Sequence, residues 1–371
     1  MILKYMSWLL VLGSIVGTIV YFNVYDRMTR APLKVLWVDS VYARDLRNIL
    51  DEFTDRTNIS VHVESVPREL YREAVTRDLD KSEQQYDIVI AEAVWTRRDI
   101  SRNFYEDITT LVRESWLFRT HSPAVDGDLF VAKSGVYYGM PVALDVFGVL
   151  IPQNAQQPQT LADLARGSLV DTQTSGELTH TFLALLLAQG GVFIDSDGNL
   201  SKTGLVSDVA KNTLEVMRTM RIPGTSPRIG RTEHLHKVAT STDIFAPLPG
   251  EGSSVYTTLY LAHKVKGSSN PRAADALLAW LGTKQAVQYL QEESGSTLVR
   301  SLHDPLLARS YSNTRRNNTV PVHFFETENA EEMLHLADTY LAGYLSGSAK
   351  FTAQETLETI ATAWEKELTI K

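Results

Sequence analysis

The hydrophobic pattern is organised around one long apolar stretch in the first half of the chain. Tyr137–Ile151 begins as a turn, with Gly139 and Pro141 beside two tyrosines, and continues as a β-rich apolar run. A run of this length predicts a buried strand. A single charge, Asp145, interrupts it. A buried carboxylate is costly without a partner, so two interpretations are open. Asp145 either caps a loop at the end of a strand, or lies on a strand that crosses between two lobes and accepts a hydrogen bond from a ligand.

The chain before this stretch alternates between strand and helix patterns. The expected elements are a strand, a helix, a strand, a helix and a strand, over Leu33–Asp39, Tyr42–Thr57, Ile59–Val66, Leu70–Leu79 and Tyr86–Ala91. This order predicts a parallel sheet with right-handed crossovers, in which ligands lie beyond the carboxyl ends of the strands. Asp39, Glu92 and Trp95 fall at those ends.

The chain after the long stretch predicts mostly helices. They are expected at Leu161–Arg166, Thr179–Gln189, Ser207–Met220, Pro271–Leu281, Thr283–Glu293, Ala330–Ser346 and Thr352–Glu367. Two strands are expected at Asp243–Gly250 and Val255–His263. The polar segment Arg221–Ser241 predicts a loop. Its His234 and His236 have metal-pair spacing, but no third ligand lies nearby, so loop histidines are favoured and no metal or cofactor is expected.

The first 25 residues form a targeting or anchoring segment. After Lys4, the run Tyr5–Tyr25 holds no charge and is about 21 residues long, enough to span a bilayer. A secretory signal normally has a shorter apolar region and small residues at a cleavage site, and no Ala-x-Ala occurs here. Residues 1–30 therefore predict an uncleaved signal anchor in preference to a cleaved signal peptide. The remainder, from residue 31, is expected to be exported and to fold without the anchor.

Composition narrows the class of protein. The chain has 371 residues, 44% hydrophobic and 22% charged, which is ordinary globular sequence sufficient for two domains. Its net charge of -8 argues against a nucleic-acid partner. The absence of cysteine excludes disulfides, thiol catalysis and thiolate metal sites. No Gly-x-Ser-x-Gly elbow, phosphate loop, zinc helix motif or Rossmann fingerprint occurs, so we expect no catalytic residues and no enzyme.

A series of short segments, in order along residues 33–370, carries a family resemblance. These segments are Leu33–Asp39, Phe53–Val63, Tyr86–Ile90, Tyr138–Pro141, Pro158–Thr160, Gly190–Gly191, Asp197–Gly198, Ala246–Gly250, Asn270–Ala274 and Leu281–Gln285. Together they resemble the family 1 extracellular solute-binding proteins of ABC importers, the group that includes maltose-binding protein. The resemblance implies an α/β, two-lobed periplasmic-binding-protein fold (type II-like) with a hinge between the lobes.

The resemblance also implies domain boundaries and a ligand site. Lobe 1 is expected over residues 31–142 and 261–300, and lobe 2 over residues 143–260 and 301–371, closing over a solute. By position, the expected ligand contacts are Trp37, Asp39, Glu92, Trp95, Asp145 and His180. Carboxylates accept hydrogen bonds from hydroxyl groups, and tryptophan faces cover sugar rings, so the expected solute is a sugar or polyol. The alternative for Trp37 and Trp95 is that they are core aromatics.

One region departs from the family pattern. Members usually carry a glycine, lysine and Ala-Met pattern before a tryptophan, between the second-lobe helix and the Pro-Leu-Pro-Gly strand. Here Arg221–Thr242 is short, polar and without tryptophan. One expected wall of the ligand site is therefore missing.

Three functions remain to be compared. The favoured one is a monomeric receptor that delivers a carbohydrate-like solute to ABC permease subunits in the inner membrane. The alternative is a membrane-anchored sensory or interaction protein on the same fold. A glycosidase would need a carboxylate pair, such as Glu92 and Asp145, at a defined separation that the sequence does not give.

Overall fold

The computed structural model describes most of the chain beyond the N-terminal segment. The described residues are 31–38, 41–79, 85–120, 135–166, 168–169, 176–195, 200–220, 227–231, 234–235, 238–239, 243–251, 256–294 and 329–369. None of the helices within these ranges is both long enough and apolar enough to cross a membrane. The predicted anchor, Asp39 and His236 lie outside the described residues.

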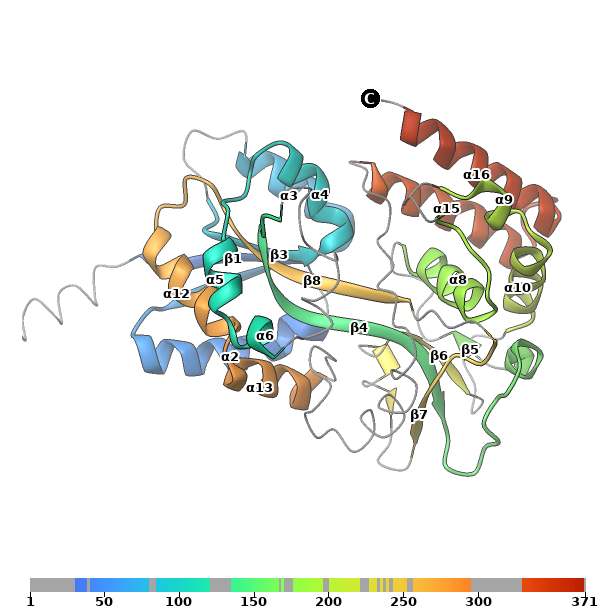
Figure 1. Ribbon diagram of the computed structural model, residues 1–371, viewed down its shortest axis with the longest axis horizontal. Helices are drawn as coiled ribbons and strands as arrows, with labels where there is room; N and C mark the ends of the chain where they lie inside the picture. The colour runs from blue at the N-terminus through green and yellow to red at the C-terminus, as the bar shows by residue number, and fades with distance from the viewer. Residues whose placement is uncertain are drawn as a thin grey trace, which may run out of the picture.

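Helices and strands are both abundant (Figure 1). The helices are α2 (Val41–Thr57), α3 (Arg68–Leu79), α4 (Ala93–Ser101), α5 (Thr109–Glu114), α6 (Trp116–Arg119), η1 (Leu161–Arg166, a 3-10 helix), α8 (Glu177–Ala188), α9 (Lys202–Leu205), α10 (Asp208–Thr219), α12 (Pro271–Leu281), α13 (Lys284–Ser294), α15 (Ala330–Leu345) and α16 (Ala353–Thr369). The strands are β1 (Leu33–Val38), β2 (Val61–Val66), β3 (Ile88–Glu92), β4 (Gly139–Ile151), β5 (Ser168–Leu169), β6 (Arg228–Arg231), β7 (Ile244–Pro247) and β8 (Thr257–Lys264).

Lobe 1 forms around the predicted parallel unit. β1 pairs in parallel with β2 on one side and β3 on the other, which confirms the sheet expected from the alternating pattern. β8 then adds to β3 in antiparallel fashion. The apolar faces of α2 and α12 pack on this sheet through residues such as Phe53 and Leu277, and both belong to one hydrophobic core with Trp37. Figure 1 shows these helices around the β1–β3 end of the sheet.

β4 is the long buried strand that the sequence predicted. Every residue of β4 is buried. Its first half pairs with β8 as far as Val146, and its second half pairs with β6 and β7. Leu144 belongs to the core of lobe 1, whereas Phe147 and Val149 belong to the core of lobe 2. β4 and β8 therefore run from one lobe into the other, as Figure 1 shows.

Lobe 2 is a helical layer packed on the second half of β4. α8 is buried along its whole length, and α10, α15 and α16 contribute to the same core. The start of α16 has the capping box that the sequence pattern indicates. The Thr352 hydroxyl donates to Glu355 Oε2 at 2.9 Å, and the Glu355 amide donates back to Thr352 Oγ1 at 3.2 Å.

The segment expected to be a loop contains a strand, which corrects the sequence-based assignment. Within Arg221–Ser241, residues Arg228–Arg231 form β6, antiparallel to β4 and parallel to β5. The stretch Arg-Ile-Gly-Arg has little β propensity and is only four residues long. Its pairing with the apolar β4, from Phe147 to Leu150, supplies the stabilisation that its own sequence lacks.

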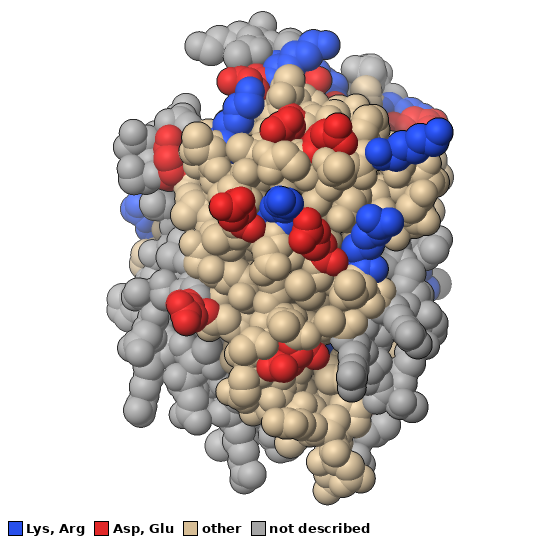
Figure 2. All heavy atoms as spheres, turned by 90° about the vertical axis from the view of Figure 1, so that its right-hand side faces the viewer, with Lys and Arg blue, Asp and Glu red and all other residues tan. Residues whose placement is uncertain are grey.

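The end of the molecule formed by lobe 2 has mixed charge. In Figure 2 the described lysine, arginine and acidic side chains are interspersed among other residue types on this face. One exposed pair joins Lys202 Nζ of α9 to Glu365 Oε2 of α16 at 2.8 Å. Such exposed pairs contribute little to stability, and the described part of this face carries no single-sign field of the kind that attracts a polyanion.

A buried histidine in lobe 1 predicts acid sensitivity. The side chain of His263 on β8 is fully buried and stacks on Tyr105, with a centroid distance of 4.3 Å. Its Nδ1 donates to the Tyr138 carbonyl at 2.9 Å, yet burial dominates and lowers the pKa of His263 to about 4. An unfolded histidine titrates near pH 6.5. Between about pH 4 and pH 6.5, His263 is therefore neutral in the folded protein and protonated in the unfolded chain. The contribution to stability is therefore complete above about pH 6.5 and is lost as the pH falls through about 4.

We expect His263→Gln to lose less stability on acidification than the wild-type protein. Between pH 7 and pH 4.5 the wild-type free energy of unfolding should fall by roughly 2–3 kcal/mol more than that of the variant. Urea unfolding at the two pH values measures both losses. Equal losses in the two proteins would show that His263 does not titrate in this range.

Candidate functional site

Strand register brings several polar side chains to one face of the sheet. On β4, Asp145 lies opposite Thr258 of β8, and Phe147 lies opposite Arg231 of β6. Directly opposed residues, and residues two apart on a strand, share a face. Phe147 belongs to the core of lobe 2, so the face that also carries Asp145, Thr258 and Arg231 is the one covered by the lobe 2 helices.

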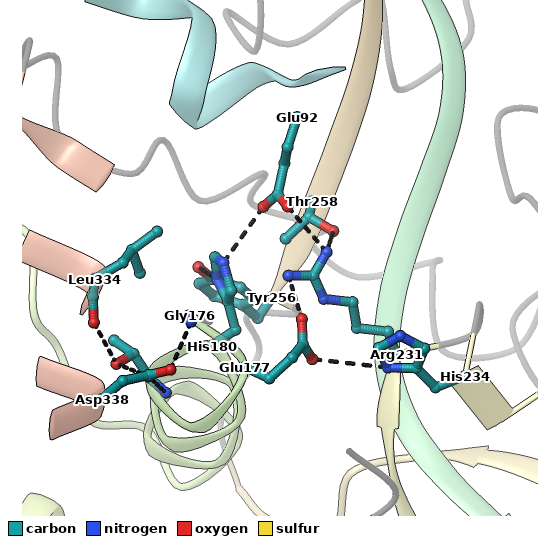
Figure 3. Close-up of polar contacts among 11 residues, drawn as sticks. Glu92, Gly176, Glu177, His180, Arg231, His234, Tyr256, Thr258, Leu334 and Asp338 are labelled. Carbon is teal, nitrogen blue, oxygen red and sulfur yellow. Dashed lines mark hydrogen bonds and ion pairs between the residues drawn. The ribbon is translucent and has the colours of Figure 1, made fainter. Parts of the chain in front are cut away.

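The N-terminus of α8 lies over this face. Gly176 has a φ of +87°, a left-handed conformation that suits glycine, immediately before the helix begins. Asp338 of α15 accepts hydrogen bonds from the Gly176 amide and from the Thr179 amide, the latter at 2.8 Å. These bonds satisfy helix-start amides and fix α8 to α15. Glu177 and His180, one turn apart, are thereby held toward the sheet (Figure 3).

Lobe 1 contributes one carboxylate to the same place. Glu92 ends β3 and lies opposite Tyr260 of β8, two residues from Thr258 and on the same face. Its Oε2 accepts a hydrogen bond from Arg231 Nη1 at 3.1 Å. Its Oε1 lies 3.3 Å from His180 Nε2. Glu92 of lobe 1 therefore contacts two side chains of lobe 2 (Figure 3).

Arg231 is the centre of this cluster. Its side chain is fully buried, its Nη1 also donates to Thr258 Oγ1 at 3.1 Å, and its Nη2 forms an ion pair with Glu177. The guanidinium lies 5.7 Å from the centroid of the Phe147 ring. Burial alone lowers the pKa of Arg231, but the charges of Glu177 and Glu92 outweigh burial and raise it above the usual arginine value. Arg231 is therefore permanently cationic, as a group between two buried carboxylates must be.

A tyrosine and a second histidine complete the cluster. Tyr256 OH and His180 Nδ1 are hydrogen-bonded, and both side chains are buried. Burial first, and the charge of Glu92 second, raise the pKa of Tyr256 well above its usual value, so the hydroxyl stays protonated and suits the role of donor. A donor at Nδ1 favours the His180 tautomer with hydrogen on Nε2, facing Glu92. His234 Nδ1 lies 3.9 Å from Glu177 Oε2.

The structure brings three of the sequence-predicted residues together. Glu92 contacts both Arg231 and His180, and the charge of Asp145 raises the pKa of Arg231. Trp37 is instead fully buried within lobe 1, and Trp95 is 6% exposed in the same core. A role for these two tryptophans in binding stays a prediction, as does that of Asp39, which lies outside the described residues.

Sequence reasoning missed the residues at the centre of the cluster, which are Glu177, Arg231, Tyr256 and Thr258. Glu177 had a recognisable signal, because a charge at the start of a strongly apolar helix has to be solvated or paired. Arg231 had none, because its strand was not predicted. The ranges that the structure describes contain no group of three or more side chains arranged to hold a metal ion, and there we find no metal centre.

Comparison with solved structures identifies the class of fold. A solute-binding protein of an ABC transporter from Agrobacterium radiobacter, in complex with ribitol, matches with a TM-score of 0.73 at 15% identity, over 91% of this chain and 98% of the other. One from Agrobacterium vitis with bound D-mannitol matches with a TM-score of 0.70 at 15% identity, over 91% and 98%. One from Thermotoga lettingae bound with alpha-D-tagatose has a TM-score of 0.72 at 14% identity, over 91% and 100%. The fold is thus that of two-lobed solute-binding proteins.

Comparison of the sequence itself identifies the family. The model of the family described as bacterial extracellular solute-binding protein matches residues 41–224, which run from α2 past α10. No curated protein matches the sequence. On the family match over residues 41–224 and the fold together, the chain is similar to the bacterial extracellular solute-binding proteins. This is a family of substrate-binding proteins, and its members act outside the cytoplasm.

Proposed function

We propose that this protein is an extracytoplasmic receptor of an ABC importer and that it binds a carbohydrate or polyol-like solute between its lobes by hinge closure. The observation that carries the proposal is the cluster of buried hydrogen-bonding side chains where the lobes meet, in a chain that the model of a solute-binding family matches over residues 41–224. Glu92 comes from lobe 1, while Glu177, His180 and Tyr256 come from lobe 2. Carboxylates and a histidine suit the hydroxyl groups of such solutes.

The ligands bound in three similar structures belong to the same class of solute. Those structures hold ribitol, D-mannitol and alpha-D-tagatose. At 14–15% identity they support the fold, and the choice of solute for this chain rests on the chemistry of its own cluster. The cluster holds acceptors in Glu92 and Asp145 and donors in Arg231 and Tyr256, a mixture that suits a neutral polyhydroxylated molecule.

The proposal includes a cellular setting and lobe boundaries. We propose that the receptor works as a monomer with ABC permease subunits of the inner membrane, tethered there if residues 1–30 are kept. We propose that lobe 1 comprises residues 31–142 and 261–300, and lobe 2 residues 143–260 and 301–371. These boundaries fall inside the crossing strands, where Leu144 and Leu259 still pack in the core of lobe 1. The main alternative, a membrane-anchored sensory or interaction protein, predicts a gene neighbourhood without permease genes.

Thermal stabilisation of the full chain by solutes tests the function. The protein is unfolded thermally in the presence of sugars, polyols and their phosphates. A solute at 100 times its dissociation constant should add about 2.7 kcal/mol to the free energy of unfolding. No stabilisation by any member of the panel would contradict the proposed solute class.

Asp145→Asn should weaken solute binding and leave the fold intact. Its backbone lies in the ladder opposite Thr258, and its side chain is on the face of the cluster. The substitution keeps the size of the side chain and removes the charge of an acceptor. We expect affinity to fall by roughly 1.5–3 kcal/mol, the range for a charge-assisted hydrogen bond.

Calorimetric titration measures the affinity, and melting of the solute-free protein serves as the control. A loss of several kcal/mol in solute-free stability with unchanged affinity would make Asp145 a structural residue. The prediction that Asp145 contacts the solute would then be wrong.

A further inference from the structure

The two lobes are joined by the protein's own side chains. Arg231 of lobe 2 donates from Nη1 to Glu92 Oε2 of lobe 1 at 3.1 Å, and its Nη2 is paired with Glu177 within lobe 2. The carboxylates are 3% and 1% exposed, and the arginine is 0% exposed. Removing one member of this buried pair leaves an uncompensated buried charge, so Arg231 and its two carboxylates depend on one another while the lobes are closed.

A second contact between the lobes lies at the edge of the first. Arg72 of α3, in lobe 1, forms ion pairs with Glu331 at 2.8 Å and with Glu332, both at the start of α15 in lobe 2. The Arg72 side chain is 33% exposed, so this contact is screened by solvent and weaker than the central one. The same helix carries Asp338, which fixes the start of α8 and hence Glu177.

We propose that Arg231 is a cross-lobe positioning residue: anchored on Glu177 in lobe 2, its guanidinium bonds Glu92 of lobe 1 and holds the protein closed in the absence of solute. The inference goes beyond the proposed function, because it concerns how the lobes sit when no solute is bound. The departure from the family pattern is consistent with this proposal. Arg221–Thr242, which lacks the tryptophan that family members usually carry, is the segment that contains β6 and Arg231.

The closed state follows from the balance of contacts. Opening the lobes separates Glu92 from Arg231 and from His180. A hydrogen bond between charged groups contributes about 1.5–3 kcal/mol, which converts to roughly a 10- to 100-fold preference for the closed arrangement. Lobe 2 retains its own pair in the open state, because Glu177 and Arg231 belong to the same lobe.

Distances between spin labels on the two lobes test this proposal directly. The chain contains no cysteine, so the substitutions Asn48→Cys on α2 and Asn212→Cys on α10 provide single labelling positions, both exposed, on lobe 1 and lobe 2. Pulsed electron paramagnetic resonance is recorded on the full chain without solute. We expect one narrow distribution of short distances.

Two variants remove the contact from opposite sides. Arg231→Met removes the guanidinium from lobe 2, and Glu92→Gln removes the charge from lobe 1 at unchanged size. Each should raise the ratio of open to closed molecules roughly 10- to 100-fold, seen as a longer and broader distance distribution. Arg228→Met is the matched control, because Arg228 lies on the same strand and its side chain donates to the Val238 carbonyl within lobe 2, so the distribution should stay short.

The outcomes separate this proposal from the receptor function. Folded variants with the wild-type distribution, or a solute-free wild-type protein that is already open, would overturn it. If Arg231→Met does not fold, Glu92→Gln alone decides the result. All of these measurements are made without solute, so failure of the solute panel bears on the proposed function only.

Discussion

Trp37→Ala is expected to lower the free energy of unfolding by about 3–5 kcal/mol. Trp37 lies in the middle strand of the parallel unit, opposite Ser65 of β2 and Ile90 of β3, and its side chain has no exposed surface. Its removal leaves a large cavity in a buried core, and such a cavity is filled only partly when the neighbours relax. Chemical unfolding of the solute-free protein measures the loss.

The comparison with a second tryptophan separates a structural role from a binding role. Trp280 packs on Phe53 at a centroid distance of 5.7 Å, but it is only partly buried at the edge of the same core. Trp280→Ala should therefore cost clearly less than Trp37→Ala. If Trp37→Ala instead leaves the solute-free protein at wild-type stability and abolishes stabilisation by solute, Trp37 belongs to the ligand site and not to the core.

Gly250→Ala is expected to cost about 2–5 kcal/mol, the sum of backbone strain and overpacking. Gly250 closes the Pro-Leu-Pro-Gly segment after β7 with a φ of +151°. A Cβ there would lie 2.0 Å from the carbonyl oxygen of Ala188, the last residue of α8. The neighbouring Gln189 side chain donates to the Pro249 carbonyl at 2.6 Å, so the turn has no room to move away.

A glycine with open surroundings provides the control. Gly347 of lobe 2 has a φ of +72°, and the nearest atom to an added Cβ is the end of the Arg218 side chain at 3.9 Å. Gly347→Ala should cost only the left-handed strain, about 1–2 kcal/mol. Thermal unfolding of both variants measures the difference. Equal losses would show that the contact with the end of α8 contributes nothing.

The main helices and strands could be predicted from the sequence because each has a clear local periodicity of apolar residues. The parallel unit, the helices of lobe 2 and the long apolar strand each fill enough consecutive positions for the pattern to be read. Boundaries shifted by a few residues, as in β3, which begins at Ile88 and includes Glu92. The resemblance to a family added the order of the lobes, which periodicity alone does not contain.

The centre of the candidate site was less predictable, because it depends on contacts far apart in the chain. Glu92 and Arg231 are 139 residues apart and meet only when both lobes are built. Position after a strand was the signal that pointed to Glu92, and the interruption of an apolar run was the signal that pointed to Asp145. Arg231 lies in a short polar strand whose existence depends on β4, so no local signal marks it.

The crossing of β4 and β8 between the lobes also governs the order in which the protein can fold. The core of lobe 1 combines residues 33–144 with residues 259–290, and the core of lobe 2 combines residues 147–256 with residues 330–364. Neither core is therefore continuous in sequence. A chain emerging from its N-terminus cannot complete lobe 1 until α13 has appeared, and lobe 2 must wait for α16. Contacts of such long range slow folding, and neither core is complete before most of the chain has been synthesised.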